Sequence, residues 1–283
     1  MTVKVVTDST ADLPPALAKE LGIAVIPLNV LFGTQVYRDG VDISGNEFYQ
    51  RLMASPRLPT TSQPSVGSFL ELYQELGETT DQVISVHISS KLSGTLNSAT
   101  LAREQYRGAC RIEIVDSQQA CMGLGLIAVA AARAARQGAS LDEVVKETQR
   151  AIHQVRFFGL LDTLEYLEKG GRIGKAQAFV GSLLHIKPIL MVRDGECQPL
   201  ERARTRGKGI ERLCELAQEH MPLEDLAVVY TTTREEAEAL ARRLQPCLPK
   251  AEVILSQVGL VVGTYLGPGV MGIALRRETA GSL

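Results

Sequence analysis

The chain has 283 residues and a formal net charge of −2, from 30 basic and 32 acidic side chains, which excludes the overall basic character of nucleic-acid-binding domains. Hydrophobic residues make up 45% and aromatic residues 5%, and tryptophan is absent, so the core must be aliphatic, as in parallel sheets covered by helices. The five cysteines include no CxxC pair; we expect reduced thiols, no metal site and a cytoplasmic location.

No segment predicts insertion into a membrane. The longest apolar run, residues 121–132, is too short to span a bilayer and leads into Arg133 and Arg136. A strand-like segment begins at Val3, which leaves no room for a signal peptide. We therefore expect neither a transmembrane segment nor a secretory signal.

The first half of the chain alternates between strand and helix patterns. The predicted strands are residues 3–7, 24–32, 83–88 and 112–115. The predicted helices are residues 15–21, 45–54, 66–76, 95–105, 119–136 and 141–153. Ser44 with Glu47 and Ser140 with Glu143 have the spacing of capping boxes, and Ser65 is expected to cap the third helix. Such alternation predicts crossover connections and a mainly parallel sheet with flanking helices.

The pattern changes after about residue 155. The predicted strands there are residues 156–161, 188–192, 198–202, 226–231, 253–257 and 271–275, and the predicted helices are residues 164–169, 207–220 and 234–244. Asp194-Gly195 between two strand-like runs indicates a β-hairpin. We therefore predict an α/β protein of two domains. Residues 1–155 form the parallel domain, and residues 156–283 form an α+β domain with a mixed or antiparallel sheet.

Two hydroxyl-rich segments, residues 60–65 and 89–95, each precede a predicted helix. Hydroxyls and free backbone N–H groups at helix starts can hold a small anionic or polar head group. Polar pairs also follow three strands, at residues 8–9, 89–90 and 116–117. Each pair alone is more typical of a helix cap, but together they favour a pocket at the carboxyl edge of the sheet.

Catalytic motifs are missing from the sequence. It contains neither a Walker A motif nor a GxSxG elbow. The four histidines (87, 153, 185 and 220) lie on or beside apolar segments, which favours structural roles, so we predict no catalytic triad. The segment KGGRIGK, residues 169–175, resembles a phosphate loop, although a glycine helix stop followed by solvated charges is the alternative. A glycine-rich stretch, residues 259–269, predicts tight turns that could present the Tyr265 hydroxyl.

Seven segments, in order along nearly the whole chain, resemble those of the DegV family. They are residues 5–9 (VVTDS), 61–65 (TSQPS), 89–95 (SSKLSGT), 116–117 (DS), 164–174 (LEYLEKGGRIG), 187–190 (KPIL) and 267–269 (GPG). The chain is similar to the fatty-acid-binding subunit of bacterial fatty acid kinase. This resemblance implies a two-domain cytoplasmic protein that holds a long-chain fatty acid in an apolar tunnel between its domains.

The resemblance also implies site residues and a partner. The carboxylate would be held by Thr61, Ser62, Ser93 and Gly94, with Tyr265 where the family often has histidine. A phenol can still donate a hydrogen bond to a carboxylate. A separate ATP-dependent fatty acid kinase subunit would phosphorylate that carboxylate to acyl phosphate. The chain would then be a carrier without catalytic residues or cofactor, its only ligand being the fatty acid.

Two other functions stay open on the sequence. One is an enzyme that acts on a phosphorylated small molecule held by residues 170–175. The other is a regulatory lipid sensor without a kinase partner. Arg172, Arg202 and Arg204 are the candidate contacts to a phosphate or to an acidic partner surface.

Overall fold

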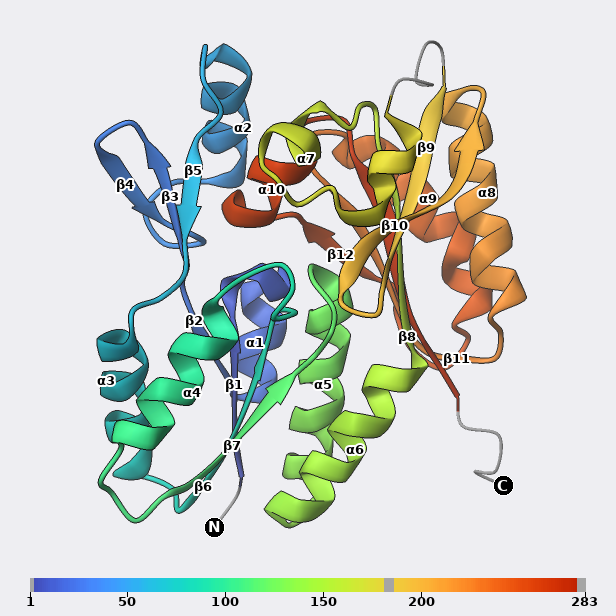
Figure 1. Cartoon of the computed structure of the whole chain (residues 1–283). Helices are drawn as coiled ribbons and strands as arrows, with labels where there is room; N and C mark the ends of the chain where they lie inside the picture. Colours follow the sequence, from blue (N-terminus) through green and yellow to red (C-terminus); the bar gives the residue numbers. More distant parts are fainter. Residues whose placement is uncertain (1–2, 181–185, 279–283) are drawn as a thin grey trace.

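Three β-sheets organise the chain in the computed structural model, which describes residues 3–180 and 186–278. The first sheet has four parallel strands in the order β2-β1-β6-β7 (Figure 1). These strands are β1 (Lys4–Asp8), β2 (Ile23–Ile26), β6 (Gln82–His87) and β7 (Arg111–Asp116). The predicted parallel sheet is confirmed.

The helices around the first sheet begin and end close to the predicted positions. They are α1 (Pro15–Leu21), α3 (Val66–Gly77), α4 (Thr95–Gln105), α5 (Met122–Arg136) and α6 (Leu141–Gln154). The capping box of Ser140 and Glu143 is formed, and Ser65 caps α3. Almost every residue of α5 is buried, because this helix packs against strands of both large sheets. The main core is therefore shared between the two halves of the chain.

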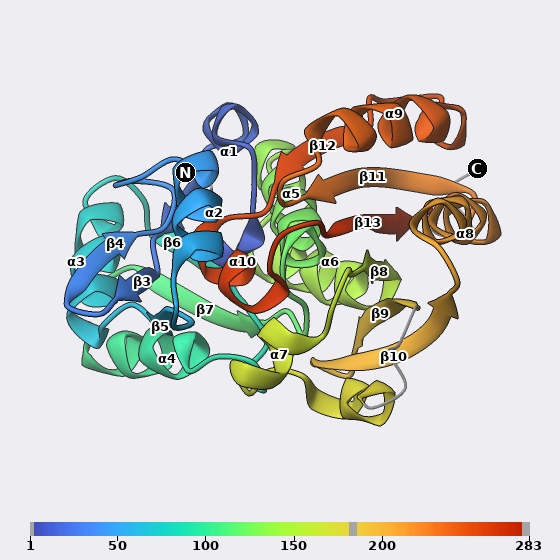
Figure 2. The ribbon, with the colours of Figure 1, turned by 90° about the horizontal axis from the view of Figure 1, so that it is seen from above.

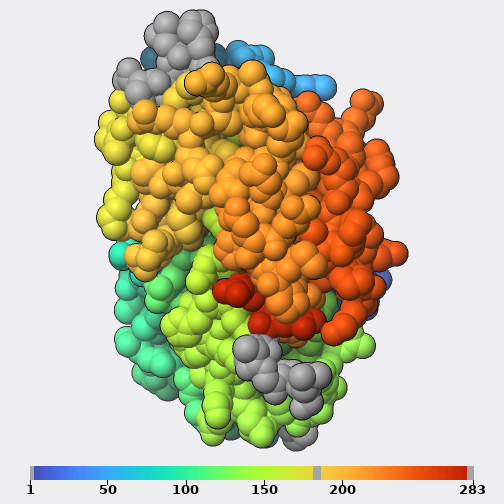
Figure 3. All heavy atoms as spheres, turned by 90° about the vertical axis from the view of Figure 1, so that its right-hand side faces the viewer, coloured from blue at the N-terminus to red at the C-terminus, as the bar shows by residue number. Residues whose placement is uncertain are grey.

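The second sheet has six strands in the order β10-β9-β8-β13-β11-β12, of which only β11 and β12 pair in parallel. The strands are β8 (Val155–Leu160), β9 (Lys187–Arg193), β10 (Glu196–Ala203), β11 (Leu223–Tyr230), β12 (Ile254–Gln257) and β13 (Met271–Arg277). The predicted hairpin turns at Asp194 and Gly195, both with positive φ. Helices α8 (Arg206–Glu219) and α9 (Arg234–Leu244) cover the outer face (Figure 3). The prediction of a mixed sheet is thus confirmed.

One predicted strand, residues 24–32, is wrong as a single element. The chain breaks at Pro27, which has no N–H to donate to a ladder. Before the break β2 joins the first sheet, and after it β3 (Asn29–Phe32) enters a small antiparallel sheet. The small sheet is completed by β4 (Gln35–Arg38) and β5 (Thr60–Ser62), and α2 (Gly45–Ala54) follows β4 along the chain.

The glycine-rich stretch predicted as turns contains a helix, α10 (Leu260–Leu266). This helix contacts α2 and α7 (Glu165–Lys169), and Figure 2 shows it near the middle of the molecule. A Cβ at Gly263 would lie 2.4 Å from the Tyr49 hydroxyl, so the close packing of α10 on α2 requires glycine there. Across the described residues, none of the helices has both the length and the apolar character that crossing a bilayer demands.

Candidate functional site

A cavity with about 930 Å³ of empty space, part of it open to solvent, is lined by residues from both halves of the chain. Its apolar wall consists of Leu28, Ile88, Leu92, Ala120, Phe157, Gly159, Leu161, Leu167, Leu190, Met191, Val192, Val261, Val262, Leu266 and Val270. Its polar members are Thr10, Thr61, Gln63, Ser93, Cys121, Arg172, Cys197 and Tyr265. This lining is suited to a molecule with a long apolar part and one polar end that the polar side chains can hydrogen-bond.

The loops that follow β1, β6 and β7 all reach this cavity, at Thr10, Ser93 and Cys121. The polar pairs predicted to form the pocket edge do not line the cavity themselves; they hold the loops whose neighbouring residues line it. Asp8 accepts hydrogen bonds from the backbone N–H groups of Thr10 (3.1 Å) and Ile88 (3.0 Å). These pairs therefore fix the loops, and neighbouring residues face the cavity.

Thr61 and Tyr265 meet at one part of the cavity wall. The Thr61 Oγ1 and Tyr265 hydroxyl oxygens are 2.6 Å apart, although the two residues are 204 positions apart in the sequence. The Arg172 guanidinium carbon lies 4.9 Å from the centre of the Tyr265 ring. A Cβ at Gly170 would lie 2.3 Å from Tyr265 Cδ1, so α7 can end against this ring only because residue 170 is glycine. Both hydroxyls are half-buried and Arg172 is exposed, which marks this part as the mouth.

Ser93 and Gly94 lie at the start of α4. Ser93 Oγ is 2.9 Å from Thr95 Oγ1 and accepts the Thr95 N–H at 3.3 Å. Gly94 precedes the helix without a side-chain cap, and a Cβ there would lie 2.6 Å from Gln63 Nε2. The Gln63 amide is thus packed onto the Gly94 backbone beside a half-buried hydroxyl. Hydroxyl, amide and helix-start N–H groups of this kind are suited to bind a carboxylate.

Four of the predicted site residues do not line the cavity. Gly94 is one of them, and it lies between the lining residue Ser93 and the side chain of Gln63. Ser62 follows Thr61 in β5, so its side chain points to the opposite side; it is exposed and accepts the Asn29 side-chain N–H at 3.3 Å. Arg202 and Arg204 are exposed on a separate groove beside β10 and α8. The Arg202 guanidinium carbon lies 4.4 Å from the centre of the Phe179 ring.

Other cavity residues were not singled out from the sequence. Gln63 stands inside the TSQPS segment, and the strand period that sets Thr61 toward the cavity would also have selected it. The apolar cavity-lining residues of α10, Val261, Val262 and Leu266, were missed because the segment was interpreted as turns. Val261 with Tyr265 and Val262 with Leu266 have the four-residue spacing of one helix face, which was the available signal.

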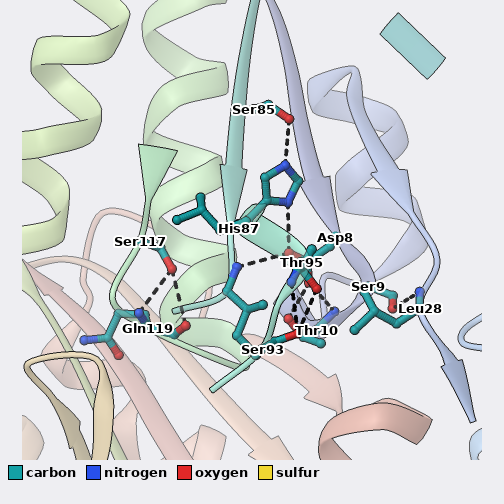
Figure 4. A network of polar contacts seen from close by, with 12 residues as sticks. Asp8, Ser9, Thr10, Leu28, Ser85, His87, Ser93, Thr95, Ser117 and Gln119 are labelled. Carbon is teal, nitrogen blue, oxygen red and sulfur yellow. Dashed lines mark hydrogen bonds and ion pairs between the residues drawn. The ribbon is translucent and has the colours of Figure 1, made fainter. Parts of the chain in front are cut away.

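A buried chain of polar groups lies behind Thr10, and Figure 4 shows most of it. His87 Nδ1 is 3.0 Å from Asp8 Oδ2, and His87 Nε2 is 2.7 Å from Ser85 Oγ. Ser85 Oγ also accepts the Tyr73 hydroxyl at 3.0 Å. Burial raises the pKa of Tyr73, which keeps it a donor. The order Asp–His–Ser is that of a hydrolase triad, an arrangement that the sequence analysis did not predict. All four side chains have an exposed fraction of 0%, so no substrate can reach them.

The first turn of α10 is held by two carboxylates from the other half of the chain. Asp39 accepts the N–H groups of Leu260 (2.8 Å) and Val261 (3.4 Å), and Asp12 accepts that of Gly259 (2.9 Å). Burial raises the pKa of Asp39 to about 6 and the pKa of Asp12 well above its usual range. Because α10 carries Tyr265, these contacts set the position of the mouth.

Stability is expected to fall as the pH rises through about 6 because of Asp39. The folded state keeps the Asp39 proton up to about pH 6, whereas the unfolded chain releases it near 3.8. The raised pKa therefore contributes stability that is fully present below pH 3.8 and is lost above pH 6, at most about 3 kcal/mol. Urea unfolding at several pH values between 3.8 and 6 measures the slope of the free energy of unfolding against pH. Asp39→Asn should flatten it relative to the unmodified chain, and an unchanged slope would contradict the assignment to Asp39.

Among residues 3–180 and 186–278, no three His, Cys, Asp or Glu side chains converge as ligands for a metal ion. At the mouth, the hydroxyls of Thr61 and Tyr265 and the exposed guanidinium of Arg172 are available to an anionic group.

Comparison with known proteins gives consistent matches along the chain. A family model described as "Uncharacterised protein, DegV family" matches residues 2–278. Protein DegV of Bacillus subtilis is 39% identical over 278 residues, which cover 96% of this chain and 98% of that protein. A structure described as fatty acid binding of a DegV family protein from Thermus thermophilus matches with a TM-score of 0.89 and 35% identity, covering 98% of this chain and 99% of that one.

Two further structures extend the comparison. The crystal structure of DegV, a fatty acid binding protein from Bacillus subtilis, has a TM-score of 0.88 and 38% identity, with coverage of 98% and 100%. A stearic-acid-binding protein from Eubacterium ventriosum has a TM-score of 0.87 and 28% identity, with coverage of 97% and 98%. The fold is therefore shared along almost the full length of proteins described as fatty-acid-binding.

Proposed function

The chain belongs to the DegV family, and on this premise we propose that it binds one long-chain fatty acid in the cavity described above. The observation that carries the proposal is the composition of that cavity, an aliphatic wall with a cluster of hydroxyls at its mouth. The acyl chain lies along the wall, between residues 1–155 and residues 156–283. The carboxylate lies at the mouth, where Thr61, Ser93 and Tyr265 donate to it.

The energetics of such a site are favourable. Burial of an acyl chain gains about 0.8 kcal/mol per methylene, so a dozen methylenes contribute about 10 kcal/mol before the costs of association. A carboxylate left unpaired inside the protein would cost several kcal/mol. The hydroxyls, the Gly94 N–H and the Gln63 amide satisfy it without a buried cation. Arg172 adds positive charge from the exposed side of the Tyr265 ring.

The chain acts as a carrier for a separate ATP-dependent fatty acid kinase subunit, which converts the bound carboxylate to acyl phosphate. The half-buried position of the hydroxyls supports this role, because a ligand carboxylate there is within reach of a second protein. The exposed guanidinium groups of Arg202 and Arg204 offer a docking surface for an acidic partner. Because the proposed reaction consumes ATP, we propose that the pair acts in the cytoplasm.

A phosphate-binding enzyme is less well supported. The positive charges around the glycine segment 170–175 are already paired, since Lys169 contacts Glu165 at 2.5 Å and Lys175 contacts Glu196 at 2.8 Å. Arg172 stacks on Tyr265 at the mouth. A lipid sensor would use the same cavity and differ only in lacking the kinase partner.

Purified protein is expected to carry close to one equivalent of a long-chain fatty acid. Burial of a dozen methylenes makes release slow, so the ligand should survive purification. Mass spectrometry of an organic extract identifies it, and native mass spectrometry gives its ratio to protein. Protein that is free of lipid and does not bind added palmitic or oleic acid would rule out the carrier function.

Arg202→Glu together with Arg204→Glu is expected to reduce kinase-dependent acyl phosphate formation at least tenfold while fatty-acid affinity stays unchanged. Both side chains lie outside the cavity, and a reversed charge at an interface slows association. The assay combines the loaded protein with a bacterial fatty acid kinase subunit and ATP. Arg234→Glu, on exposed α9, is the matched control. Equal turnover by the unmodified chain, the double variant and Arg234→Glu would show that the kinase subunit does not dock at Arg202 and Arg204.

A further inference from the structure

The cavity face of β8 has a gap in its middle. Phe157, Gly159 and Leu161 alternate onto this face, and all three line the cavity. The middle residue has no side chain. Its neighbour in β9 is Leu190, which also lines the cavity, and its neighbour in β13 is a second glycine, Gly272.

The backbone does not require glycine at position 159. Its φ lies outside the left-handed region, and a Cβ there would lie 3.4 Å from Leu161 Cδ1 and 3.5 Å from Phe157 Cε1, which are ordinary contacts. Gly272 differs, because its Cβ would lie 2.7 Å from the carbonyl oxygen of Phe158. A methyl group at 159 would therefore fit the fold and extend into the cavity.

A glycine inside a strand weakens the strand, and often marks a place where a ligand approaches the backbone closely. Residue 159 is buried, so solvent exposure does not explain the missing side chain. Given the fatty-acid function proposed above, we propose that Gly159 is a specificity-determining position. The acyl chain passes over its Cα, and the absent side chain admits ligands long enough to reach this point.

The consequence is a dependence on chain length. A short acid whose tail ends before Gly159 makes the same contacts whatever residue stands there. A long acid must cross the position, so every methyl group added at 159 displaces methylenes from the wall. Alanine should therefore lower the affinity for stearic acid relative to lauric acid by about tenfold, the effect of one or two unburied methylenes. Leucine should lower it by about 100-fold.

The experiment measures the affinities of delipidated Gly159→Ala and Gly159→Leu for lauric, myristic, palmitic and stearic acids. Gly207→Ala is the matched control. Gly207 is an exposed glycine in α8, outside the cavity, and an added Cβ there would have no atom within 4 Å other than those of its chain neighbours and the helix backbone. It reports the effect of the substitution on the unfolded chain alone. Thermal unfolding checks each fold, and the alanine variant decides the result alone if the leucine variant does not fold.

A stearic-to-lauric affinity ratio that falls stepwise from glycine to alanine to leucine supports the role of Gly159. An unchanged ratio, or an equal loss for all four acids, would overturn it while leaving fatty-acid binding intact. Failure of the unmodified chain to bind any of the acids would instead refute the proposed function, so the two failures are distinguishable.

Discussion

Replacing Ser93 by alanine and Tyr265 by phenylalanine together is expected to weaken fatty-acid binding by about 100-fold or more. Each change removes one hydroxyl from the mouth without adding bulk. A hydrogen bond to a charged group contributes about 1.5–3 kcal/mol, and each 1.4 kcal/mol is a factor of about ten in affinity. Thr61, whose Oγ1 is 2.6 Å from the Tyr265 hydroxyl, would lose its partner as well. The remaining donors, Thr61, Gln63 and the Gly94 N–H, leave the carboxylate with fewer hydrogen bonds than in the unmodified chain.

Isothermal titration of delipidated protein with palmitic acid measures this loss. The matched control is Ser90→Ala combined with Tyr37→Phe. Ser90 belongs to the same loop as Ser93, but its hydroxyl contacts Asp116. The Tyr37 hydroxyl contacts Gln35 and Arg51, away from the cavity. If the two double variants bound palmitic acid equally well, the carboxylate would not lie at the mouth. Palmityl alcohol, which has no charge, should lose less affinity than palmitic acid.

Much of the fold follows from local signals in the sequence. The capping box of Ser140 and Glu143 begins α6, and Asp194-Gly195 adopts the positive φ values of the predicted hairpin. The errors have physical causes. Residues 24–32 were predicted as one strand, but Pro27, which has no N–H to donate, lies between the parts that join two different sheets. Glycines usually disfavour helix, but Gly263 is needed in α10 because Tyr49 lies against it.

The arrangement of the site depends on contacts between distant segments, which no local sequence pattern predicts. Thr61 and Tyr265 come from β5 and α10, and only the fold brings their oxygens together. Strand alternation in β5 explains why Thr61 faces the cavity and Ser62 does not. The family resemblance supplied Thr61, Ser93 and Tyr265 as candidates, whereas the aliphatic wall could not be distinguished from ordinary core. Gly159 is recognisable only once its neighbours in three dimensions are known.

The buried Asp8–His87–Ser85 chain leads to the second large effect, which concerns stability. Asp8→Ala is expected to lower the free energy of unfolding by about 3–5 kcal/mol, because each buried donor left without an acceptor costs about 1–3 kcal/mol. Asp8 accepts hydrogen bonds from the Thr10 N–H and hydroxyl, from the Ile88 N–H and from His87 Nδ1. Removal of its carboxylate leaves all four donors unpaired where water cannot replace it. Urea unfolding measures the change.

Asp116→Ala is the matched control. Like Asp8, Asp116 is the last residue of a strand of the first sheet, but it is half-buried and accepts hydrogen bonds from exposed partners. Its loss should cost about 1 kcal/mol.

A catalytic triad and a purely structural network predict different results for a change at Ser85. Ser85→Ala would then abolish ester hydrolysis, whereas we expect no hydrolysis in the unmodified chain because Ser85 and His87 are fully buried. Ser85→Ala should instead destabilise the fold, because Tyr73 and His87 Nε2 lose their common partner. Equal stability of Asp8→Ala and Asp116→Ala would show that the network does not stabilise the loops behind the cavity.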